Sequence, residues 1–309
     1  MGRKNIAIIG AGHVGATAAY ALLVSRQVQT LGLLDMNESV LQGALLDLSH
    51  AASFYGSTVK KFNYDELPSF DYIVITAGPS QSGVKTDRLA DLAKAEKIIS
   101  SIACEFKEVN YKGKVIIASN PVDLMTYHFL KYSGLKKEQV IGTGTLLDTA
   151  RYHVILADKL NVDIKDITGF VLGEHGASSF ICFEESKVAD KTLRQVIEEK
   201  GIDTSSFIDE MEREVKDSGF DILKTQGATY YGIGSTIATI IEALERDEET
   251  ILPLSTSVEG EYGIADICIS LPVKISDHSF KIIPDYPLSE TERKKLIDSA
   301  SILKSHLEK

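Results

Sequence analysis

The chain has 309 residues, 44% of them hydrophobic and 25% charged, and a formal net charge of −11 at pH 7. This length allows a large buried core and two domains, and the acidic balance argues against a nucleic-acid partner, which would need a basic surface. The three cysteines, Cys104, Cys182 and Cys268, are odd in number and too far apart for a disulfide framework. No apolar segment approaches the roughly 20 residues of a membrane span. We therefore expect a cytoplasmic protein with reduced thiols and no membrane partner.

The first half of the chain alternates short apolar runs with helical patterns. Strands are predicted at residues 5–9, 30–34, 72–76 and 115–118, and helices at residues 12–25 and 40–50. Strands that alternate with helices are typical of right-handed crossover connections in a parallel sheet. The fold class predicted for residues 1–141 is therefore α/β, with a doubly wound parallel sheet of the Rossmann type.

From Leu146 onward the pattern changes. Helices are predicted from Leu146, at residues 204–215 and at residues 229–243, and strands at residues 180–183, 264–271 and 273–275. Pro272 is expected to separate the last two strands, because proline cannot donate to a strand ladder. A capping box at Ser289-Glu290-Thr291-Glu292 opens a final amphipathic helix. We expect residues 142–309 to form a C-terminal α/β domain, tightly fused to the first.

A glycine pattern follows the first predicted strand and opens the first predicted helix. It reads Gly-x-Gly-x-x-Gly from Gly10 to Gly15. In this context the glycines permit a tight turn, close backbone approach to a pyrophosphate, and close packing of the helix on the strand. Twenty residues beyond Gly15, Asp35 ends the second strand, where a carboxylate accepts ribose hydroxyls and repels a 2′-phosphate. We expect NAD as the cofactor, and His13 as a side chain at the surface of the turn.

A histidine lies between glycines in Gly173-Glu174-His175-Gly176, directly after the apolar run at residues 170–172. A histidine at the end of a strand, with small neighbours that let a substrate approach, is well placed to act as a general acid or base. Taken alone, the tetrapeptide also fits a hydrogen-bonded loop residue, and the surrounding motifs favour the catalytic interpretation.

Several motifs in chain order resemble those of the L-lactate and malate dehydrogenase family, and within it the L-lactate and L-2-hydroxyisocaproate dehydrogenases. Besides the two glycine motifs, they are Thr76-Ala77-Gly78, Ser119-Asn120-Pro121-Val122-Asp123, the stretch from Gly142 to Arg151, and the stretch from Gly227 to Gly232. The resemblance runs from about residue 5 to the C-terminus. It implies an NAD-dependent enzyme that reversibly transfers a hydride between NADH and a 2-oxo acid such as pyruvate.

The resemblance also assigns catalytic roles. His175 would exchange the substrate proton, and Asp148 would bond the far ring nitrogen of His175, because a neighbouring carboxylate raises a histidine pKa into the working range. Arg151 would bind the substrate carboxylate through two parallel N–H bonds. Arg88 would polarise the substrate carbonyl when a loop closes. A simple ion pair between Asp148 and Arg151, one helical turn apart, is the alternative interpretation.

Further contacts are implied in the same way. The additional substrate contacts are Gln81, Asn120 and Thr229. The dinucleotide contacts are Gly10, Gly12, His13, Val14, Gly15, Asp35, Tyr64, Thr76, Ala77, Gly78, Ser119 and Asn120. No metal ion is implied, and the family assembles into homo-oligomers, so a homotetramer or homodimer is expected.

The loop at residues 79–87 departs from the family pattern. Gln81 stands where malate-specific relatives carry an arginine, so oxaloacetate should be a poor substrate, because a second buried carboxylate would lack a cation. Lys85 could nevertheless supply that cation. The loop is one residue longer than in most lactate dehydrogenases, and Thr86-Asp87-Arg88 resembles the L-2-hydroxyisocaproate branch. Small side chains in the pocket wall near Ser218-Gly219-Phe220, together with Ala177-Ser178 after the histidine loop, also favour an aliphatic substrate side chain larger than methyl.

Two positions argue against activation by fructose 1,6-bisphosphate. Relatives that bind it use an arginine and a histidine, and this chain has His153 and Thr168 at those positions. Three rival functions remain open: a malate dehydrogenase, a non-catalytic NAD-binding protein, and an NAD-using glycosidase. The last would require a metal-binding cysteine and histidine in the cleft.

Overall fold

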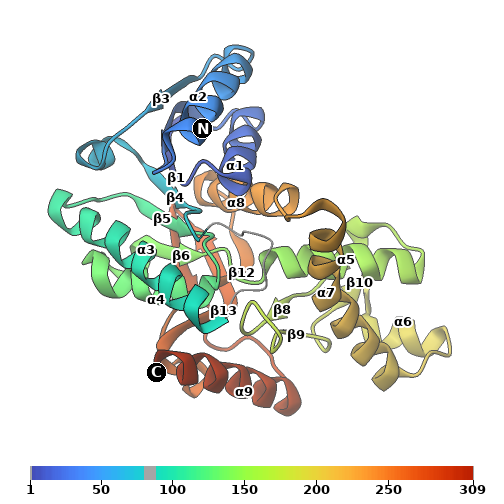
Figure 1. Cartoon of the computed structure of the whole chain (residues 1–309). Helices are drawn as coiled ribbons and strands as arrows, with labels where there is room; N and C mark the ends of the chain where they lie inside the picture. The colour runs from blue at the N-terminus through green and yellow to red at the C-terminus, as the bar shows by residue number, and fades with distance from the viewer. Residues whose placement is uncertain (1, 80–87, 309) are drawn as a thin grey trace. The chain divides into compact units, whose positions relative to one another are not determined.

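The computed structural model describes residues 2–79 and 88–308 and divides into two compact units (Figure 1). The first unit comprises residues 1–143, 230–250 and 275–280, and the second comprises residues 144–229, 251–274 and 281–309. Among the helices of the described residues, none is long and apolar enough to cross a membrane.

Six parallel strands form the sheet of the first unit. They are β1 (Lys4–Ile9), β2 (Val28–Leu34), β3 (Thr58–Lys61), β4 (Tyr72–Ile75), β5 (Lys114–Ile117) and β6 (Val140–Gly142), in the order β6-β5-β4-β1-β2-β3. All four residues of β4 are buried, as expected of a parallel strand covered on both faces. The strand order reverses at β1, so β1 and β4 flank a topological switch point, where such sheets bind their ligands.

Helices and short turns of 3-10 helix connect these strands. They are α1 (His13–Val24), α2 (Glu38–Ser53), η1 (Tyr64–Ser69), α3 (Arg88–Val109), α4 (Val122–Ser133) and η2 (Lys137–Gln139). Helix α8 (Tyr231–Glu245) comes much later in the chain and belongs to the same unit. Helix α8 packs on α1 at Gly234, where an added Cβ would lie 2.7 Å from the Cγ2 of Thr17. A side chain at position 234 would therefore push the two helices apart.

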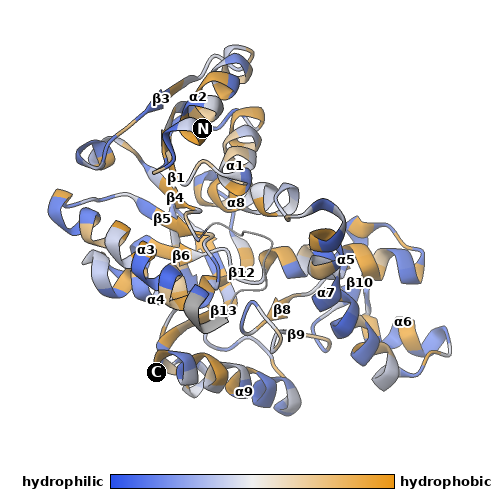
Figure 2. Ribbon diagram, in the orientation of Figure 1, coloured by the Kyte–Doolittle hydropathy of each residue, from blue (hydrophilic) through white to orange (hydrophobic). Residues whose placement is uncertain are grey.

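The second unit contains most of the remaining elements. They are α5 (Leu146–Leu160), η3 (Ile164–Asp166), β7 (Ile167–Thr168), β8 (Val171–Leu172), β9 (Phe180–Ile181), β10 (Lys187–Val188), β11 (Lys191–Thr192), α6 (Leu193–Glu199), α7 (Thr204–Gln226), β12 (Thr250–Glu259), η4 (Glu261–Gly263), β13 (Ala265–Ser276), β14 (Ser279–Ile282) and α9 (Glu290–Leu307). Figure 2 shows the acidic helix α7 as largely hydrophilic, whereas hydrophobic residues gather on the strands. Phe207, Met211 and Val215 are the residues through which α7 joins the core.

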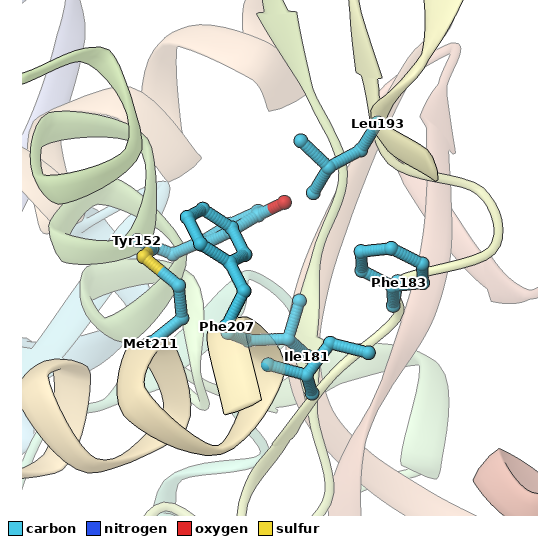
Figure 3. A pocket seen from close by; sticks show the side chains of 7 residues that line it. Tyr152, Ile181, Phe183, Leu193, Phe207 and Met211 are labelled. Atoms are coloured by element: carbon cyan, nitrogen blue, oxygen red, sulfur yellow. The ribbon is translucent and has the colours of Figure 1, made fainter. Parts of the chain in front are cut away.

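A small apolar pocket, without room for a water molecule, lies within this core (Figure 3). Its lining residues are Tyr152, Ile181, Phe183, Leu193, Phe207, Ile208 and Met211. Every lining residue except Tyr152 is purely hydrocarbon or thioether in its side chain, so the pocket offers no convergent polar groups for a substrate.

The predicted fold class is confirmed, and most predicted element boundaries differ from the structure by a few residues, with the largest corrections at β13 and α7. The predicted break at Pro272 is wrong, because β13 runs through it from Ala265 to Ser276. Proline removes only the donor, and the carbonyl oxygen of Pro272 still accepts a hydrogen bond of 2.9 Å from the N–H of Ile283. Helix α7 continues beyond the predicted residue 215 and ends where Gly227 adopts a left-handed conformation with φ of +81°.

Candidate active site

The glycine turn of the first unit lies between the end of β1 and the start of α1. Gly10 has φ of +106°, and an added Cβ there would lie 2.7 Å from the backbone nitrogen of Ala77. A Cβ on Gly15 would lie only 1.8 Å from the carbonyl oxygen of Gly10, whereas the position beside Gly12 is open space. Gly12 caps α1 without any side-chain hydrogen bond. The first-turn N–H groups of α1 thus keep their capacity for an anion, and the open side at Gly12 fits the pyrophosphate of a dinucleotide.

Asp35, at the end of β2, is held against this turn. One carboxylate oxygen accepts the N–H of Ala11 at 2.7 Å, and the other accepts the N–H of Asn37 at 2.8 Å. A carboxylate has about four acceptor positions, so each oxygen can still accept a ribose hydroxyl. The residues around the turn therefore fit NAD.

The other predicted dinucleotide residues lie in the same unit. Thr76 donates its hydroxyl to the carbonyl oxygen of Gly10 at 2.8 Å, and Ser119 donates to the carbonyl oxygen of Ala77 at 2.6 Å. These bonds join the carboxyl ends of β1, β4 and β5, and the exposed Asn120 follows Ser119 directly. The residues after three neighbouring strands thus form one connected edge of the sheet.

Two aromatic predictions belong to this unit as well. His13 opens α1, and its ring stacks on Tyr230 with centroids 5.4 Å apart and an interplanar angle of 29°. Tyr64 opens η1, where burial and the charge of Glu105 raise its pKa to about 12. Tyr64 is therefore a neutral hydroxyl at physiological pH.

In the second unit, one carboxylate joins the predicted catalytic residues. Asp148 lies in the first turn of α5, and one of its oxygens is 2.5 Å from Nδ1 of His175. Its other oxygen accepts a hydrogen bond of 2.9 Å from Nη1 of Arg151. Both bonds exist together, so the ion pair with Arg151 and the partnership with His175 are not alternatives.

The electrostatics of this cluster favour a charged Asp148. Its side chain is 9% exposed, against 24% for His175 and 14% for Arg151. Burial by itself raises the pKa of Asp148, but the opposing effects of His175 and then Arg151, through charge and hydrogen bonds, outweigh burial and hold the pKa below its usual value. A buried anion thus stands beside a histidine and an arginine at neutral pH.

Local structure explains why these side chains meet. The hydroxyl of Thr145, the N-cap residue of α5, donates to the carbonyl oxygen of Val171, and the N–H of Val171 donates to the hydroxyl of Thr149 at 2.9 Å. The start of α5 is therefore fixed to β8. Gly173 then turns with φ of +94° and pairs with Ser270 through two backbone hydrogen bonds of 3.1 Å, which directs the histidine loop past the start of α5.

A glycine of α7 makes room for Arg151. An added Cβ on Gly219 would lie 3.2 Å from Nη2 and 3.4 Å from Nη1 of Arg151. The guanidinium group therefore packs directly against the backbone of α7. The sequence prediction ended this helix at residue 215 and treated Gly219 only as a small residue of the pocket wall, so it missed this contact.

The remaining predicted residues lie at the start of α3, just before α8 or outside the described residues. Thr229 is half-buried and lies between Gly227 and α8. Arg88 is the first residue of α3, and Gln81 and Lys85 lie outside the described residues. Within residues 2–79 and 88–308, there is no group of three or more histidine, cysteine, aspartate or glutamate residues that could hold a metal ion.

Comparisons with known proteins agree with this architecture. Residues 4–142 match the family model for the lactate/malate dehydrogenase NAD binding domain, and residues 145–309 match the model for the lactate/malate dehydrogenase alpha/beta C-terminal domain. An L-lactate dehydrogenase of Borrelia turicatae is 38% identical over 99% of this chain and 98% of its own.

Two solved structures are also very similar. A lactate dehydrogenase from a Medee basin deep-sea metagenome library has a TM-score of 0.93 and 32% identity, and the match covers 100% of this chain and 99% of that one. The minor L-lactate dehydrogenase of Enterococcus mundtii, in its ligands-bound form, has a TM-score of 0.93 and 31% identity, and the match covers 99% of this chain and 98% of that one. With both halves matched in order and the phosphate turn and histidine cluster in place, this chain belongs to the lactate/malate dehydrogenase family.

Proposed function

We propose that this protein is an NAD-dependent L-2-hydroxy acid dehydrogenase of the L-lactate type, which interconverts a 2-oxo acid such as pyruvate and its L-2-hydroxy acid. The observation that carries the proposal is the shared carboxylate of Asp148, bonded to His175 at 2.5 Å and to Arg151 at 2.9 Å. Asp148 thereby holds a proton donor, His175, close to a group that can bind a carboxylate, Arg151. The names of the relatives, L-lactate dehydrogenases from several bacteria, support the same substrate class.

Reduction of a 2-oxo acid needs one hydride and one proton. NAD in its reduced form supplies the hydride when bound. His175 donates the proton to the carbonyl oxygen, and Asp148 keeps the other ring nitrogen protonated and stabilises the imidazolium form. In the reverse direction the same histidine removes the hydroxyl proton.

Arg151 orients the substrate. It uses Nη1 on Asp148, and a guanidinium group has five N–H donors in a planar fork, so donors remain for the substrate carboxylate. By resemblance, Arg88 polarises the carbonyl, Asn120 bonds the substrate oxygen, and Gln81 and Thr229 line the space for the substrate side chain. These four assignments rest on position in the family motifs.

We assign dinucleotide binding and substrate binding to different halves of the sequence. We assign dinucleotide binding to residues 1–141, through Gly10, Gly12, Val14, Gly15 and the other residues named above, and substrate binding to residues 142–309. Homo-oligomers and a cytoplasmic location are proposed from the family resemblance. The location is also supported by Cys104, Cys182 and Cys268, which form no disulfide.

A panel of 2-oxo acids with increasing side-chain size, assayed with NADH and with NADPH, tests the function. We expect rapid oxidation of NADH with pyruvate and slow oxidation with oxaloacetate. NADH should be strongly preferred over NADPH, because the carboxylate of Asp35 would face the 2′-phosphate of NADPH. Faster turnover of branched or aromatic 2-oxo acids would identify the L-2-hydroxyisocaproate type instead. Failure of every 2-oxo acid to oxidise NADH would contradict the proposal.

Replacing Gly219 by alanine should weaken substrate binding while increasing the thermal stability of the protein. The new methyl group would press on the guanidinium of Arg151, so the half-saturating 2-oxo acid concentration should rise about fivefold, equivalent to ~1 kcal/mol of binding. Thermal stability should rise, because alanine is favoured over glycine inside a helix by up to ~1 kcal/mol. Gly43→Ala in α2, where an added Cβ meets nothing within 4 Å, is the matched control. Equal kinetics in the two variants would refute the contact.

Fructose 1,6-bisphosphate should leave the kinetics unchanged. His153 bonds the carbonyl oxygen of Gly169 at 2.9 Å, and burial lowers its pKa below the usual value, so it is a neutral ring with a partner. Such a group is a poor phosphate ligand compared with an arginine. The half-saturating pyruvate concentration measured with and without the sugar bisphosphate checks this, and a several-fold decrease would show that the site exists.

A further inference from the structure

The C-terminal helix reaches the histidine loop through one buried serine. Ser299 lies on α9 and is completely buried. Its hydroxyl oxygen accepts a hydrogen bond of 2.8 Å from the backbone N–H of Glu174, the residue before His175. The loop is thus tied to α9 one residue from the proton-exchanging group.

A second serine extends this tie to the far side of the loop. The hydroxyl of Ser178 is 2.9 Å from that of Ser299, and Ser178 also donates to the carboxylate of Glu174. The two ends of the turn that carries His175 are therefore linked to each other and to the same buried hydroxyl. Any displacement of the turn would break bonds on both sides of the histidine.

The packing at this point leaves little freedom. An added Cβ on Gly173 would lie 2.9 Å from the hydroxyl oxygen of Ser299, so the backbone of the loop passes directly over the serine. Lys295, one turn earlier on α9, donates to Glu212 of α7 at 2.8 Å, and α7 is the helix against which Arg151 packs. Helix α9 is therefore joined both to the histidine loop and to the helix behind Arg151.

We propose that Ser299 is a positioning residue for the dehydrogenase reaction: its hydroxyl holds the turn of residues 173–178 so that His175 keeps its hydrogen bond to Asp148. The inference rests on the proposed function for its kinetic consequences. Its structural basis, a hydroxyl that bonds Glu174 and Ser178 together, is independent of the substrate.

Ser299→Ala removes the acceptor of the Glu174 N–H and the partner of Ser178. Small displacements of a catalytic group strongly reduce turnover, and we expect kcat to fall about tenfold. The half-saturating 2-oxo acid concentration should change less than about twofold, because Arg151 keeps its own contacts, and NADH affinity should be unchanged. With NADH deuterated at nicotinamide C4, the isotope effect on kcat should increase, because proton and hydride transfer become slower than other steps.

Ser301→Ala is the matched control. Ser301 lies on the same helix, is exposed, and bonds only back to the carbonyl oxygen of Ile297 in its described contacts. We expect this variant to keep the parent kcat and isotope effect. Ser178→Ala is a second test of the same tie from the loop side, and it should reproduce the kinetic effect of Ser299→Ala even if that variant accumulates poorly. In the double variant the two effects should be less than additive, because both remove one bonded unit.

Hydrogen exchange gives a readout that does not need activity. Peptides covering residues 173–178 should exchange faster in Ser299→Ala than in the parent or in Ser301→Ala. Faster exchange together with reduced kcat and unchanged half-saturation supports the proposal. If Ser299→Ala only melts at a lower temperature, with kcat and loop exchange equal to those of Ser301→Ala, the positioning role is overturned. Absence of any 2-oxo acid reduction by the parent chain would instead refute the proposed function, while the exchange comparison would still decide the role of Ser299.

Discussion

His175→Ala should reduce kcat by about 10²–10⁴-fold, the range that a positioned general acid or base contributes. The reduction of a 2-oxo acid cannot finish without a proton on the carbonyl oxygen, and alanine leaves only water to supply it. The glycine turn that would hold NADH belongs to β1 and α1, so the NADH dissociation constant should change less than about twofold. Stopped assays of product formation and fluorescence titration with NADH measure the two quantities.

The NADH titration is the internal control for this variant. Unchanged NADH affinity with lost turnover shows an intact dinucleotide site and a missing proton donor. A variant within about tenfold of the parent kcat would contradict the acid–base role of His175, because general acid–base catalysis contributes more than that.

Asp148→Asn should lower kcat by about 10²–10³-fold, and it should also weaken substrate binding. The amide has nearly the shape of the carboxylate but carries no charge, so it neither stabilises the imidazolium form of His175 nor selects the correct tautomer. In hydrolases that use a similar pair, the same change lowers kcat by about 10⁴-fold. Arg151 loses its ionic partner at 2.9 Å and becomes less ordered. The half-saturating 2-oxo acid concentration should therefore rise as well.

The dependence of kcat on pH should differ between the parent enzyme and Asp148→Asn. The pKa of Asp148 lies below its usual value because His175 and Arg151 outweigh its burial, so the parent enzyme should show no loss of kcat from this carboxylate between pH 5 and 8. Asp148→Asn should be impaired across that whole range. Recovery of the parent kcat at any pH within it would mean that the charge on Asp148 is not required.

A double-variant comparison separates the pair from two independent contributions. If Asp148 acts through His175, adding Asp148→Asn to His175→Ala should cost little further kcat. If the two substitutions lower kcat additively, Asp148 contributes to turnover mainly by holding Arg151.

The parts of the fold that could be predicted are those determined by local sequence. The turn from Gly10 to Gly15 is a continuous motif that follows a buried strand, and the single-turn spacing of Asp148 and Arg151 places both on one helix face. The capping box at Ser289 likewise identifies the start of α9, because the side chain and backbone partners are three residues apart.

Contacts between distant segments could not be predicted from spacing. His175 and Asp148 are 27 residues apart and were paired only by family resemblance, while Ser299 and Glu174 are 125 residues apart and carried no signal. Gly219 was interpreted as a small wall residue, because the nearness of Arg151 depends on how α5 and α7 pack. The error at Pro272 had another cause: the rule concerns the missing donor, and at this position the strand continues through the acceptor.

The central claim is that this chain moves a hydride to the carbonyl carbon of a 2-oxo acid while His175 supplies the proton. Incubation of the parent protein with pyruvate and NADH that carries deuterium at both C4 positions of the nicotinamide, followed by isolation of the product, tests it most directly. We expect L-lactate with deuterium at C2, formed by the parent protein and formed in much smaller amounts by His175→Ala. D-lactate, lactate without deuterium at C2, or no lactate at all would contradict it.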